Sequence, residues 1–338
     1  MKAVQLIKYS KTHPKYRLAE IDEGKLGPED IRVQVRTAGV NPVDYKISHG
    51  DIKLLLPYKL PLTMGNELVG TITEIGKQVP HGFKIGDRVF ARMPIDRIGA
   101  FAESAVLKYS SVAKVPEYLT DEEAAAIPLT ALTTLQALNL FNGKPGDSLF
   151  ISGGTGSFGA MAIPIATALG YKVITSGSER NRPKVENLGI SKFIDYHTTD
   201  YTEILHDIDF VIDTIGGKEI KKSLAILKPG GTVVSLNPPV NKEFAERMGV
   251  SEFQKILFTL DGLKIDHLAA KEGKNYRFIF VRSSGIQLAL AAKILEQKQI
   301  HPAIGKVYTL DEYDQALTQV EQGHNSGKII IKNTISPS

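Results

Sequence analysis

The sequence predicts an α/β protein in which a doubly wound parallel sheet is inserted into a second, β-rich domain. Three observations carry this prediction. Residues 154–159 form a G-x-G-x-x-G turn between an apolar run and a helical stretch. From Asp147 to Arg282, short apolar runs alternate with helical stretches, which is typical of a parallel sheet covered on both faces. The first third contains short, evenly spaced β-forming runs instead, which favours a compact barrel.

The first third is divided into short strands by Gly, Pro and Asp. In residues 31–40, apolar side chains recur at every second position. Three more strands are expected, at 67–76, 87–93 and 101–107. At Thr120 the sequence pattern changes from strand-like to helical. Thr120 is an N-cap candidate with Glu123 three residues later, and Pro128 interrupts the helical stretch.

The remaining two thirds begin with the alternating region. Its expected strands are 148–152, 171–176, 192–196, 208–214, 231–236 and 276–282. Helices are expected at 159–170, with a kink at Pro164, at 180–189, and at 283–297 with a Ser cap. Strands return at 306–310 and 328–332. We therefore expect a β-rich domain of residues 1–124 and 283–338, and a parallel-sheet domain of residues 125–282 inserted into it.

Composition excludes several classes of protein. The 338 residues are enough for two domains with full cores. Net charge is only +4, from 41 basic and 37 acidic residues without long runs of one sign, so no nucleic-acid or membrane partner is expected. No signal peptide or apolar span is evident, and the expected location is cytoplasmic. The absence of cysteine excludes disulfides, a thiolate nucleophile and cysteine-ligated zinc.

The glycine-rich turn is the strongest functional signal. In a strand–turn–helix unit the first glycine permits the turn, the second lets backbone N–H groups approach a pyrophosphate, and the third lets helix and strand pack closely. The alternative is a glycine-rich loop that binds no ligand. The residues expected to contact the cofactor here are Gly154, Thr155, Gly156, Ser157, Phe158 and Gly159.

A set of motifs in a fixed order covers nearly the whole chain. They are AGVNPVDYKISHG (38–50), LPLTMGNELVGTITEIGKQV (60–79), FKIGDRVFAR (83–92), GAFAES (99–104), AAAIPLTALTTLQAL (124–138), the glycine turn, and HNSGKIIIK (324–332). Through them the chain resembles the medium-chain dehydrogenase/reductase superfamily, and within it the zinc-free quinone oxidoreductase branch of the zeta-crystallin type. The resemblance implies a Rossmann dinucleotide-binding domain of residues 125–282 inserted into a GroES-like catalytic barrel of residues 1–124 and 283–338.

The resemblance also argues against a catalytic metal. Zinc-dependent relatives place ligands at positions that here hold Asn41, Asn66 and Leu129, none of which is a good zinc ligand. Without a Lewis acid, alcohol oxidation loses its main driving element. A bound hydride donor and a pocket suit acceptors that are already electrophilic, such as quinones and α,β-unsaturated carbonyls.

NADPH is the expected cofactor. The end of the second nucleotide-domain strand holds Ser176 where NAD enzymes carry an acid, and Ser178 and Arg180 follow in the S-x-R-N pattern of the family. Glu179 lies twenty residues after Gly159 and is a competing candidate for the acid, but we expect it to point to solvent. The alternative for Arg180 is a solvated side chain at a helix start.

Five further positions are candidate cofactor contacts. In relatives, the positions of Thr133 and Tyr196 lie beside the nicotinamide and the adenosine phosphate; a helix threonine bonded to its own backbone and a simple strand-end tyrosine are the alternatives. Gly216 and Ser235 follow strand ends, where ligands of parallel sheets gather. Lys328 is expected to reach the cofactor or to be a surface lysine.

The substrate side is expected from Asn41, Asp44 and Tyr45, in one loop of the barrel domain. The Tyr45 hydroxyl is a candidate proton donor, although we favour orientation of the substrate by Tyr45 and protonation by solvent. Asn41 and Asp44 have the alternative of holding the loop through side-chain-to-backbone bonds. The eight histidines show no metal-ligand spacing, and three of them, His49, His81 and His324, are expected in loops.

These observations together predict an NADPH-dependent reductase of quinones or α,β-unsaturated carbonyls. An enoyl thioester reductase is one alternative, and a structural or RNA-associated cofactor-binding protein with little turnover is another. We also expect a homodimer, because the strand at 276–282 lies near the sheet edge and an apolar edge invites pairing.

Overall fold

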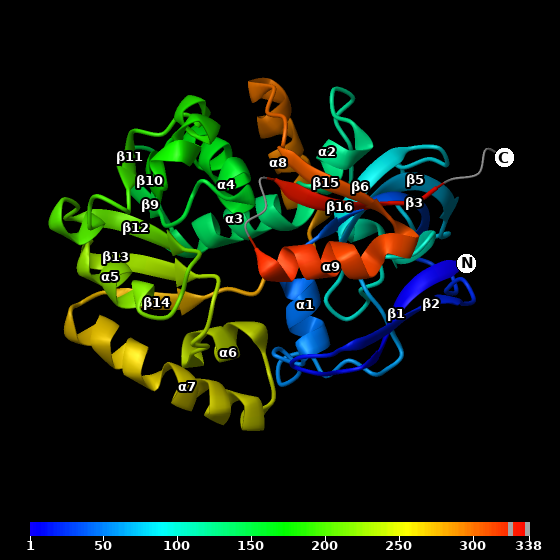
Figure 1. Cartoon of the computed structure of the whole chain (residues 1–338), viewed down its shortest axis with the longest axis horizontal. Helices are drawn as coiled ribbons and strands as arrows, with labels where there is room; N and C mark the ends of the chain where they lie inside the picture. The colour runs from blue at the N-terminus through cyan, green and yellow to red at the C-terminus, as the bar shows by residue number, and fades with distance from the viewer. Residues whose placement is uncertain (324–326, 335–338) are drawn as a thin grey trace. The chain divides into compact units, whose positions relative to one another are not determined.

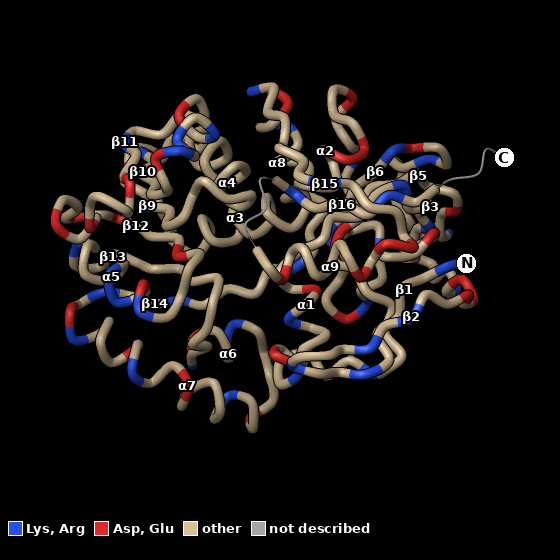
Figure 2. Tube along the Cα trace, viewed as in Figure 1, with Lys and Arg blue, Asp and Glu red and all other residues tan. Residues whose placement is uncertain are grey.

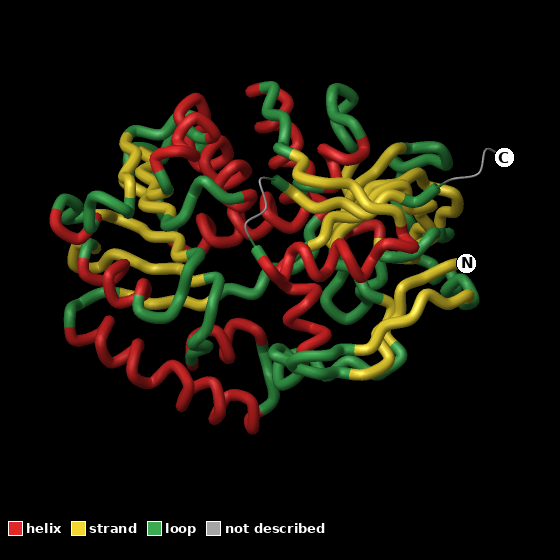
Figure 3. The backbone as a smooth tube through the Cα atoms, viewed as in Figure 1, coloured by secondary structure: helices red, strands yellow, loops and turns green. Residues whose placement is uncertain are grey.

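A computed structural model describes residues 1–323 and 327–334 and divides them into two compact units (Figure 1). The barrel unit comprises Met1–Leu132 and the described residues from Arg282 onward, and the sheet unit comprises Thr133–Val281. The boundaries expected from the sequence lie at 124/125 and 282/283, and as a functional division they stay a prediction. Figure 3 shows the strands gathered in two groups, one in each unit.

The barrel unit is built mainly from antiparallel strands. Its larger sheet has the order β15-β16-β3-β5-β6-β8, with β7 also paired to β3, and its smaller sheet has the order β2-β1-β4. The strands are β1 (Lys2–Lys8), β2 (Lys15–Glu20), β3 (Asp30–Val40), β4 (Leu62–Thr63), β5 (Glu67–Ile75), β6 (Arg88–Arg92), β7 (Ser104–Lys108), β8 (Val112–Lys114), β15 (Ile304–Thr309) and β16 (Lys328–Lys332). The period-two side chains Ile31, Val33 and Val35 are buried, as β3 requires.

The helices of this unit are α1 (Pro42–His49), α2 (Asp121–Ala125), α8 (Gly285–Lys298) and α9 (Tyr313–Gln322), with single 3₁₀ turns at Tyr109–Ser111 and Leu310–Glu312. α3 (Pro128–Phe141) runs across the boundary between the units. Thr120 caps α2 with Glu123 in a capping box, and Ser284 caps α8, so both predicted caps are confirmed. The loop expected around Asp44 and the loop position of His49 are wrong, because both residues lie in α1.

The sheet unit has six parallel strands in the order β11-β10-β9-β12-β13-β14, which confirms the predicted Rossmann topology. The strands are β9 (Ser148–Ile151), β10 (Lys172–Gly177), β11 (Lys192–Asp195), β12 (Ile208–Asp213), β13 (Leu227–Ser235) and β14 (Asn275–Phe278). The helices are α4 (Ser157–Ala168), α5 (Glu219–Ala225), α6 (Lys242–Met248) and α7 (Glu252–Lys271). The chain order reverses between β9 and β12, and ligands of such sheets bind at the carboxyl ends of the strands there.

Two helix predictions in the sheet unit differ from the structure. The helix expected at 180–189 is replaced by two 3₁₀ segments, Glu179–Lys184 and Glu186–Leu188, because Pro183 cannot supply the N–H that an α-helix needs. α7 lies in the alternating region where helices were expected between strands, but its bounds were not predicted. It buries Phe258 and Ile265 but exposes the apolar side chains Phe253, Ile256, Leu260 and Leu263, so its sequence lacks a one-sided apolar stripe.

Neither unit carries charge of mainly one sign. Basic and acidic residues are interspersed along both units (Figure 2). Within residues 1–323 and 327–334, every helix is too short or too polar to cross a bilayer.

Candidate functional site

The glycine-rich turn joins β9 to α4 in the sheet unit. Gly153 has a φ of +64°, in the left-handed region that favours glycine, whereas Gly156 has a φ of −82°. The turn was expected to depend on the first glycine of the G-x-G-x-x-G motif. The glycine with the positive φ is instead Gly153, one residue before the motif. Gly156 is the N-cap of α4 and offers no side chain to the first turn, so the N–H groups that open the helix are uncapped.

The three motif glycines have different surroundings. A Cβ at Gly154 would collide with the Thr175 hydroxyl, and a Cβ at Gly159 would collide with the Gly154 carbonyl. A Cβ at Gly156 would meet nothing nearer than the Gly153 carbonyl, at 3.7 Å. Gly154 and Gly159 are thus required for packing within the protein. Gly156 leaves open space in front of a helix N-terminus, which suits a pyrophosphate.

The buried carboxylate of Asp213, at the end of β12, ties the neighbouring strand ends together. It accepts hydrogen bonds from the hydroxyl of Ser235, the last residue of β13, at 2.8 Å, from the Ser152 hydroxyl after β9 at 3.3 Å, and from the Gly216 N–H at 3.0 Å. Asp213 and Ser235 are fully buried. The predicted site residues Gly216 and Ser235 are therefore brought together by an acid that the sequence reasoning missed.

The end of β10 lies against the turn. The Ser176 hydroxyl, which is buried, accepts a hydrogen bond from the Gly153 N–H at 3.2 Å, so Ser176 supports the turn itself. Gly177 lies so close to Thr155 that a Cβ there would collide with the threonine side chain. Gly177 is a second residue of this region that sequence reasoning missed, although its place directly after the expected strand 171–176 was a usable signal.

The arginines after β10 are not equivalent. Arg182 pairs with Glu179 at 3.2 Å and lies over the Phe193 ring. Arg180 is exposed and has no hydrogen-bond or ion-pair partner within the part of the chain that the structure describes. Ser178 is partly buried and caps the 3₁₀ segment that contains both arginines. Only Arg180 is thus left to meet an external anion.

Four other predicted cofactor residues have the following places. Thr133 is buried on α3, and Ser157 and Phe158 form the first turn of α4. Tyr196 follows β11 and is 57% exposed, with its ring next to that of His197. The exposure leaves both interpretations of Tyr196 in place, and its contact with a cofactor stays a prediction.

In the barrel unit, Asn41 and Asp44 belong to a buried polar cluster. Asn41 is the N-cap of α1, and its N–H donates to Asp44 Oδ2 at 2.8 Å, while Asn66 Nδ2 donates to Asp44 Oδ1 at 2.7 Å. Asp44 is fully buried and Asn41 nearly so. This geometry matches the alternative in which both residues hold the local backbone, and substrate contact by either stays a prediction.

Glu67 and Lys328 complete this cluster. Lys328 is buried, and its ammonium lies 2.6 Å from Glu67 Oε1 and also donates to Asn41 Oδ1. Asn41 Nδ2 donates to Glu67 Oε1 at 2.7 Å, and the Leu129 N–H donates to Glu67 Oε2 at 2.7 Å. The interpretation of Lys328 as a surface lysine is wrong, and the structure groups it with the predicted substrate residues.

Burial governs the protonation of the cluster. Loss of hydration raises the pKa of the Asp44 carboxyl to about 7, against the opposing hydrogen bonds from Asn66 and Asn41. Burial likewise lowers the pKa of Arg92 to about 10, which leaves that guanidinium charged at neutral pH. Arg92 Nε and Asn66 Oδ1 are buried without a hydrogen-bond partner among the described residues.

Tyr45 is the predicted substrate residue with a free polar group. It lies on α1, partly exposed, and its hydroxyl has no hydrogen-bond partner among residues 1–323 and 327–334. Burial, followed by the charges of Glu321 and Asp51, raises the pKa of Tyr45 above its usual value. The hydroxyl therefore stays protonated through neutral pH and serves better as a hydrogen-bond donor than as an acid. Of the other predicted histidines, His81 lies in a loop and His324 lies outside the described residues.

The cluster does not fit a zinc ion. Both oxygens of Glu67 and both of Asp44 already accept hydrogen bonds, and Leu129 contributes only its backbone N–H. Lys328 places a positive charge against the same carboxylate that a metal would need. Among the described residues, His, Cys, Asp and Glu nowhere form a group of three suited to a metal.

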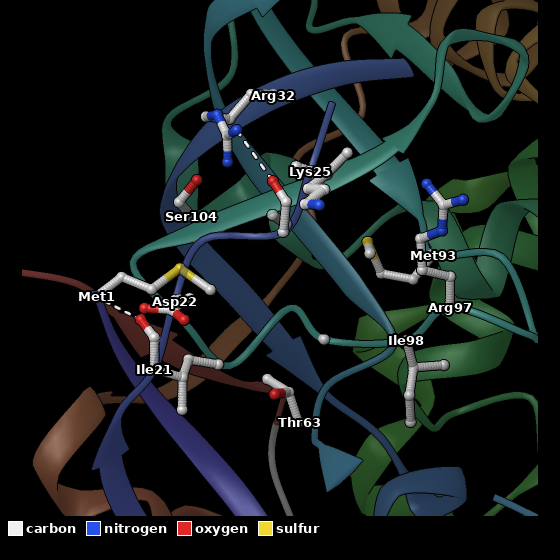
Figure 4. Close-up of a pocket in the computed structure, with 14 residues that line it drawn as sticks. Met1, Ile21, Asp22, Lys25, Arg32, Thr63, Met93, Arg97, Ile98 and Ser104 are labelled. Carbon is white, nitrogen blue, oxygen red and sulfur yellow. Dashed lines mark hydrogen bonds between the residues drawn. The ribbon is translucent and has the colours of Figure 1, made fainter. Parts of the chain in front are cut away.

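A cavity elsewhere in the barrel unit does not coincide with this cluster. It has a volume of about 370 Å³ and is lined by residues that include Arg32, Arg97 and Met93 (Figure 4). Its arginines are already paired, Arg32 with Glu74 at 2.6 Å and Arg97 with Asp30 at 2.8 Å. None of the predicted site residues lines it.

Comparison with known proteins places this geometry among oxidoreductases. Residues 27–117 match the family described as "Alcohol dehydrogenase GroES-like domain", and residues 188–331 match "Zinc-binding dehydrogenase". The Mus musculus protein named "NAD(P)H oxidoreductase RTN4IP1, mitochondrial" is 30% identical over 327 residues, which cover 90% of this chain and 82% of that protein. The Spinacia oleracea "Quinone-oxidoreductase homolog, chloroplastic" is 26% identical over 314 residues, which cover 90% of each. The structure of the quinone oxidoreductase from Coxiella burnetii has a TM-score of 0.82 and 27% identity, and the match covers 98% of this chain and 99% of that one.

Replacement of Asp44 by Asn is predicted to change the pH dependence of stability. The pKa of the Asp44 carboxyl is about 7 in the folded chain, against an ordinary pKa of 3.8. Protonated Asp44 therefore favours the folded state at low pH, and this contribution to stability is lost as the pH rises from about 4 toward 7. Asn cannot ionise. The melting temperature of Asp44→Asn relative to the parent should therefore rise between pH 5 and pH 8. The exposed Asp22→Asn is the control, and a pH-independent difference for Asp44→Asn would contradict the assignment.

Proposed function

Because the chain belongs to the quinone oxidoreductase branch of the medium-chain dehydrogenase/reductase superfamily, we propose that it is an NADPH-dependent reductase of quinones or α,β-unsaturated carbonyls that works without zinc. At the coarser level it is an NAD(P)H-dependent oxidoreductase that acts on a small molecule. The observation that carries the proposal is the open, uncapped start of α4 beside Gly156, with the unpartnered Arg180 in the same unit.

The cofactor would be held by the sheet unit. The first turn of α4 supplies backbone N–H groups to the pyrophosphate, and the helix dipole favours the negative charge. The hydrogen bonds of Asp213 hold the segments of Gly216 and Ser235 in place, and Gly177 leaves room for the Thr155 side chain. Thr133 and Tyr196 are further proposed contacts. The bound nicotinamide supplies the hydride.

The preference for NADPH rests on charge. Ser176 replaces the acid that would repel a 2′-phosphate, and Ser178 and Arg180 are the groups proposed to bind it. Glu179 is exposed and paired with Arg182, in line with its expected solvent-facing position.

The barrel unit supplies the acceptor side. Tyr45 would orient the acceptor carbonyl through its free hydroxyl, and solvent would protonate the reduced product. Asn41 and Asp44 support the start of α1, on which Tyr45 lies. Zinc independence is supported by the donor set, because Lys328 and the hydrogen bonds to Glu67 and Asp44 leave no free anionic ligand in the cluster.

We also propose a homodimer and a cytoplasmic location, with no nucleic-acid or membrane partner. β14 lies at the edge of its sheet, and α7 exposes four apolar side chains, which supports self-association through the sheet unit. The mouse and spinach relatives are named as mitochondrial and chloroplastic proteins, so the location stays a prediction.

Arg180→Ala is expected to weaken NADPH binding by about 1.5–3 kcal/mol, because a hydrogen bond to a charged group contributes about that much. NADH, which lacks the 2′-phosphate, should bind with unchanged affinity. Arg182→Ala is the matched control, because Arg182 is already paired within the protein. Titration calorimetry with both cofactors measures the effect, and equal losses for NADPH and NADH would show that Arg180 has a structural role.

Gly156→Val is expected to abolish NADPH binding and turnover together while the protein stays folded. The new side chain enters the open space in front of α4, and the backbone at φ −82° accepts valine. Gly159→Ala is the contrasting variant, because its Cβ collides with the Gly154 carbonyl and should lower the melting temperature. Unchanged NADPH affinity in a folded Gly156→Val protein would refute the site.

Tyr45→Phe is expected to slow acceptor reduction by less than about 100-fold and to leave NADPH affinity unchanged. An essential general acid would contribute on the order of 10²–10⁴-fold, but the raised pKa of Tyr45 favours an orienting role. Steady-state kinetics with a quinone and an enone measure the effect. A loss above 100-fold would refute protonation by solvent.

A further inference from the structure

Lys328, Asn41 and Glu67 meet at one end of three adjacent strands. β16 pairs antiparallel with β3 so that Ile329 lies opposite Val40, which places Lys328 beside Asn41 across 287 positions of sequence. β5 pairs antiparallel with β3 so that Leu68 lies opposite Ala38, which brings Glu67 to the same place from the other side. The strand register therefore delivers a cation, an amide and an acid to one point.

The backbone is shaped to accept the buried acid. A Cβ at Gly39 would collide with Glu67 Oε1, so glycine at this position leaves room for the carboxylate. The side chain of Glu67 is completely buried and that of Lys328 is 5% exposed. A buried pair of this kind adds little net stability, but removal of one partner leaves an uncompensated charge, so its main effect is to specify geometry.

This geometry extends to the residues proposed to meet the acceptor. Asn41 is held by Lys328 at Oδ1 and by Glu67 at Nδ2, and it is also the N-cap of α1. Tyr45 lies in the next turn of that helix, where its hydroxyl is free. A shift of Asn41 would therefore move the start of α1 and the Tyr45 side chain with it.

We propose that Lys328 is the resident cation of this cluster and a positioning residue for acceptor reduction, acting through Glu67 and Asn41 on α1. This inference rests on the proposed function, since its kinetic readout is reduction of the acceptor. The ammonium neutralises the one carboxylate that a divalent cation would otherwise need, which makes the cluster complete without a metal. Cofactor contact by Lys328 is the competing interpretation, and the experiment separates the two.

The test compares four variants of the full chain. Lys328→Met removes the charge with little change in volume, and Glu67→Gln removes the opposite charge. The double variant removes both, so neither member of the pair is left without the other. Lys332→Met is the matched control from the same strand, because Lys332 is exposed and pairs with Glu122 at the surface.

Lys328→Met and Glu67→Gln should each lower the melting temperature by about 6–20 °C, because each leaves a buried charge unpaired. Each should also lower kcat/KM for the acceptor about 10–100-fold, with the Kd for NADPH changed less than twofold. The double variant should recover much of both losses, since the two sites are directly coupled. Lys332→Met should match the parent, and elemental analysis of the parent should find less than stoichiometric zinc.

Four results would overturn the proposal. A double variant no better than Lys328→Met would show that the ammonium itself is required, and a loss of NADPH affinity in Lys328→Met would assign Lys328 to the cofactor. A Lys328→Met protein that matches the Lys332→Met control would remove the role altogether, as would one tightly held zinc per parent chain. The melting temperatures do not depend on turnover. If the parent fails to reduce any acceptor, that result counts against the proposed function. The melting temperatures of the four variants still decide whether Lys328 and Glu67 act as a coupled pair.

Discussion

A buried carboxylate with both oxygens engaged is the constraint on which each unit of this protein depends. In the sheet unit, Asp213 binds the Ser152 and Ser235 hydroxyls and the Gly216 N–H, and so gathers three strand ends at the edge where parallel sheets bind ligands. In the barrel unit, Glu67 binds Lys328, Asn41 and the Leu129 N–H. An ion or dipole left without partners at such sites is costly, so the surrounding backbone geometry is tightly specified.

The two carboxylates support different kinds of chemistry. In the sheet unit the protein leaves the first N–H groups of α4 and the guanidinium of Arg180 available to an anionic ligand. In the barrel unit Lys328 offsets the charge of Glu67, and the Tyr45 hydroxyl on the neighbouring helix has no partner among the described residues. In the proposed function, the sheet unit binds the phosphates of the hydride donor and the barrel unit orients a neutral electrophile. These two roles are the ones expected of a reductase that needs no Lewis acid.

Features set by neighbours in sequence could be predicted from the sequence. The six strands of the parallel sheet, the caps at Thr120 and Ser284 and the glycine-rich turn all follow from local periodicity and turn chemistry. Asn41, Asp44 and Tyr45 were expected in one loop, whereas Asn41 is the N-cap of α1 and Pro42 is its first residue, which are favoured residue types at a helix start. The bounds of α7 could not be predicted because the helix is apolar on two faces. Residues 180–189 were expected to form an α-helix, although Pro183 lies within them.

The residues of the candidate site likewise divide into those with a local signal in the sequence and those without one. The glycines and Arg180 could be proposed from spacing, but the burial of Lys328 depends on strand pairing across 287 positions and leaves no local signal. Asp213 ends an ordinary apolar strand, and only the packed structure reveals that its carboxylate joins three strand ends.

The central claim is that this chain transfers hydride from NADPH to an already electrophilic small molecule. The most direct measurement is the initial rate of NADPH and NADH oxidation by the purified, chelator-treated protein with a quinone, an α,β-unsaturated ketone and an enoyl thioester. The account predicts turnover of the quinone or the ketone, faster with NADPH than with NADH. Turnover restricted to the enoyl thioester, equal use of both cofactors, or cofactor binding without oxidation by any acceptor would contradict it.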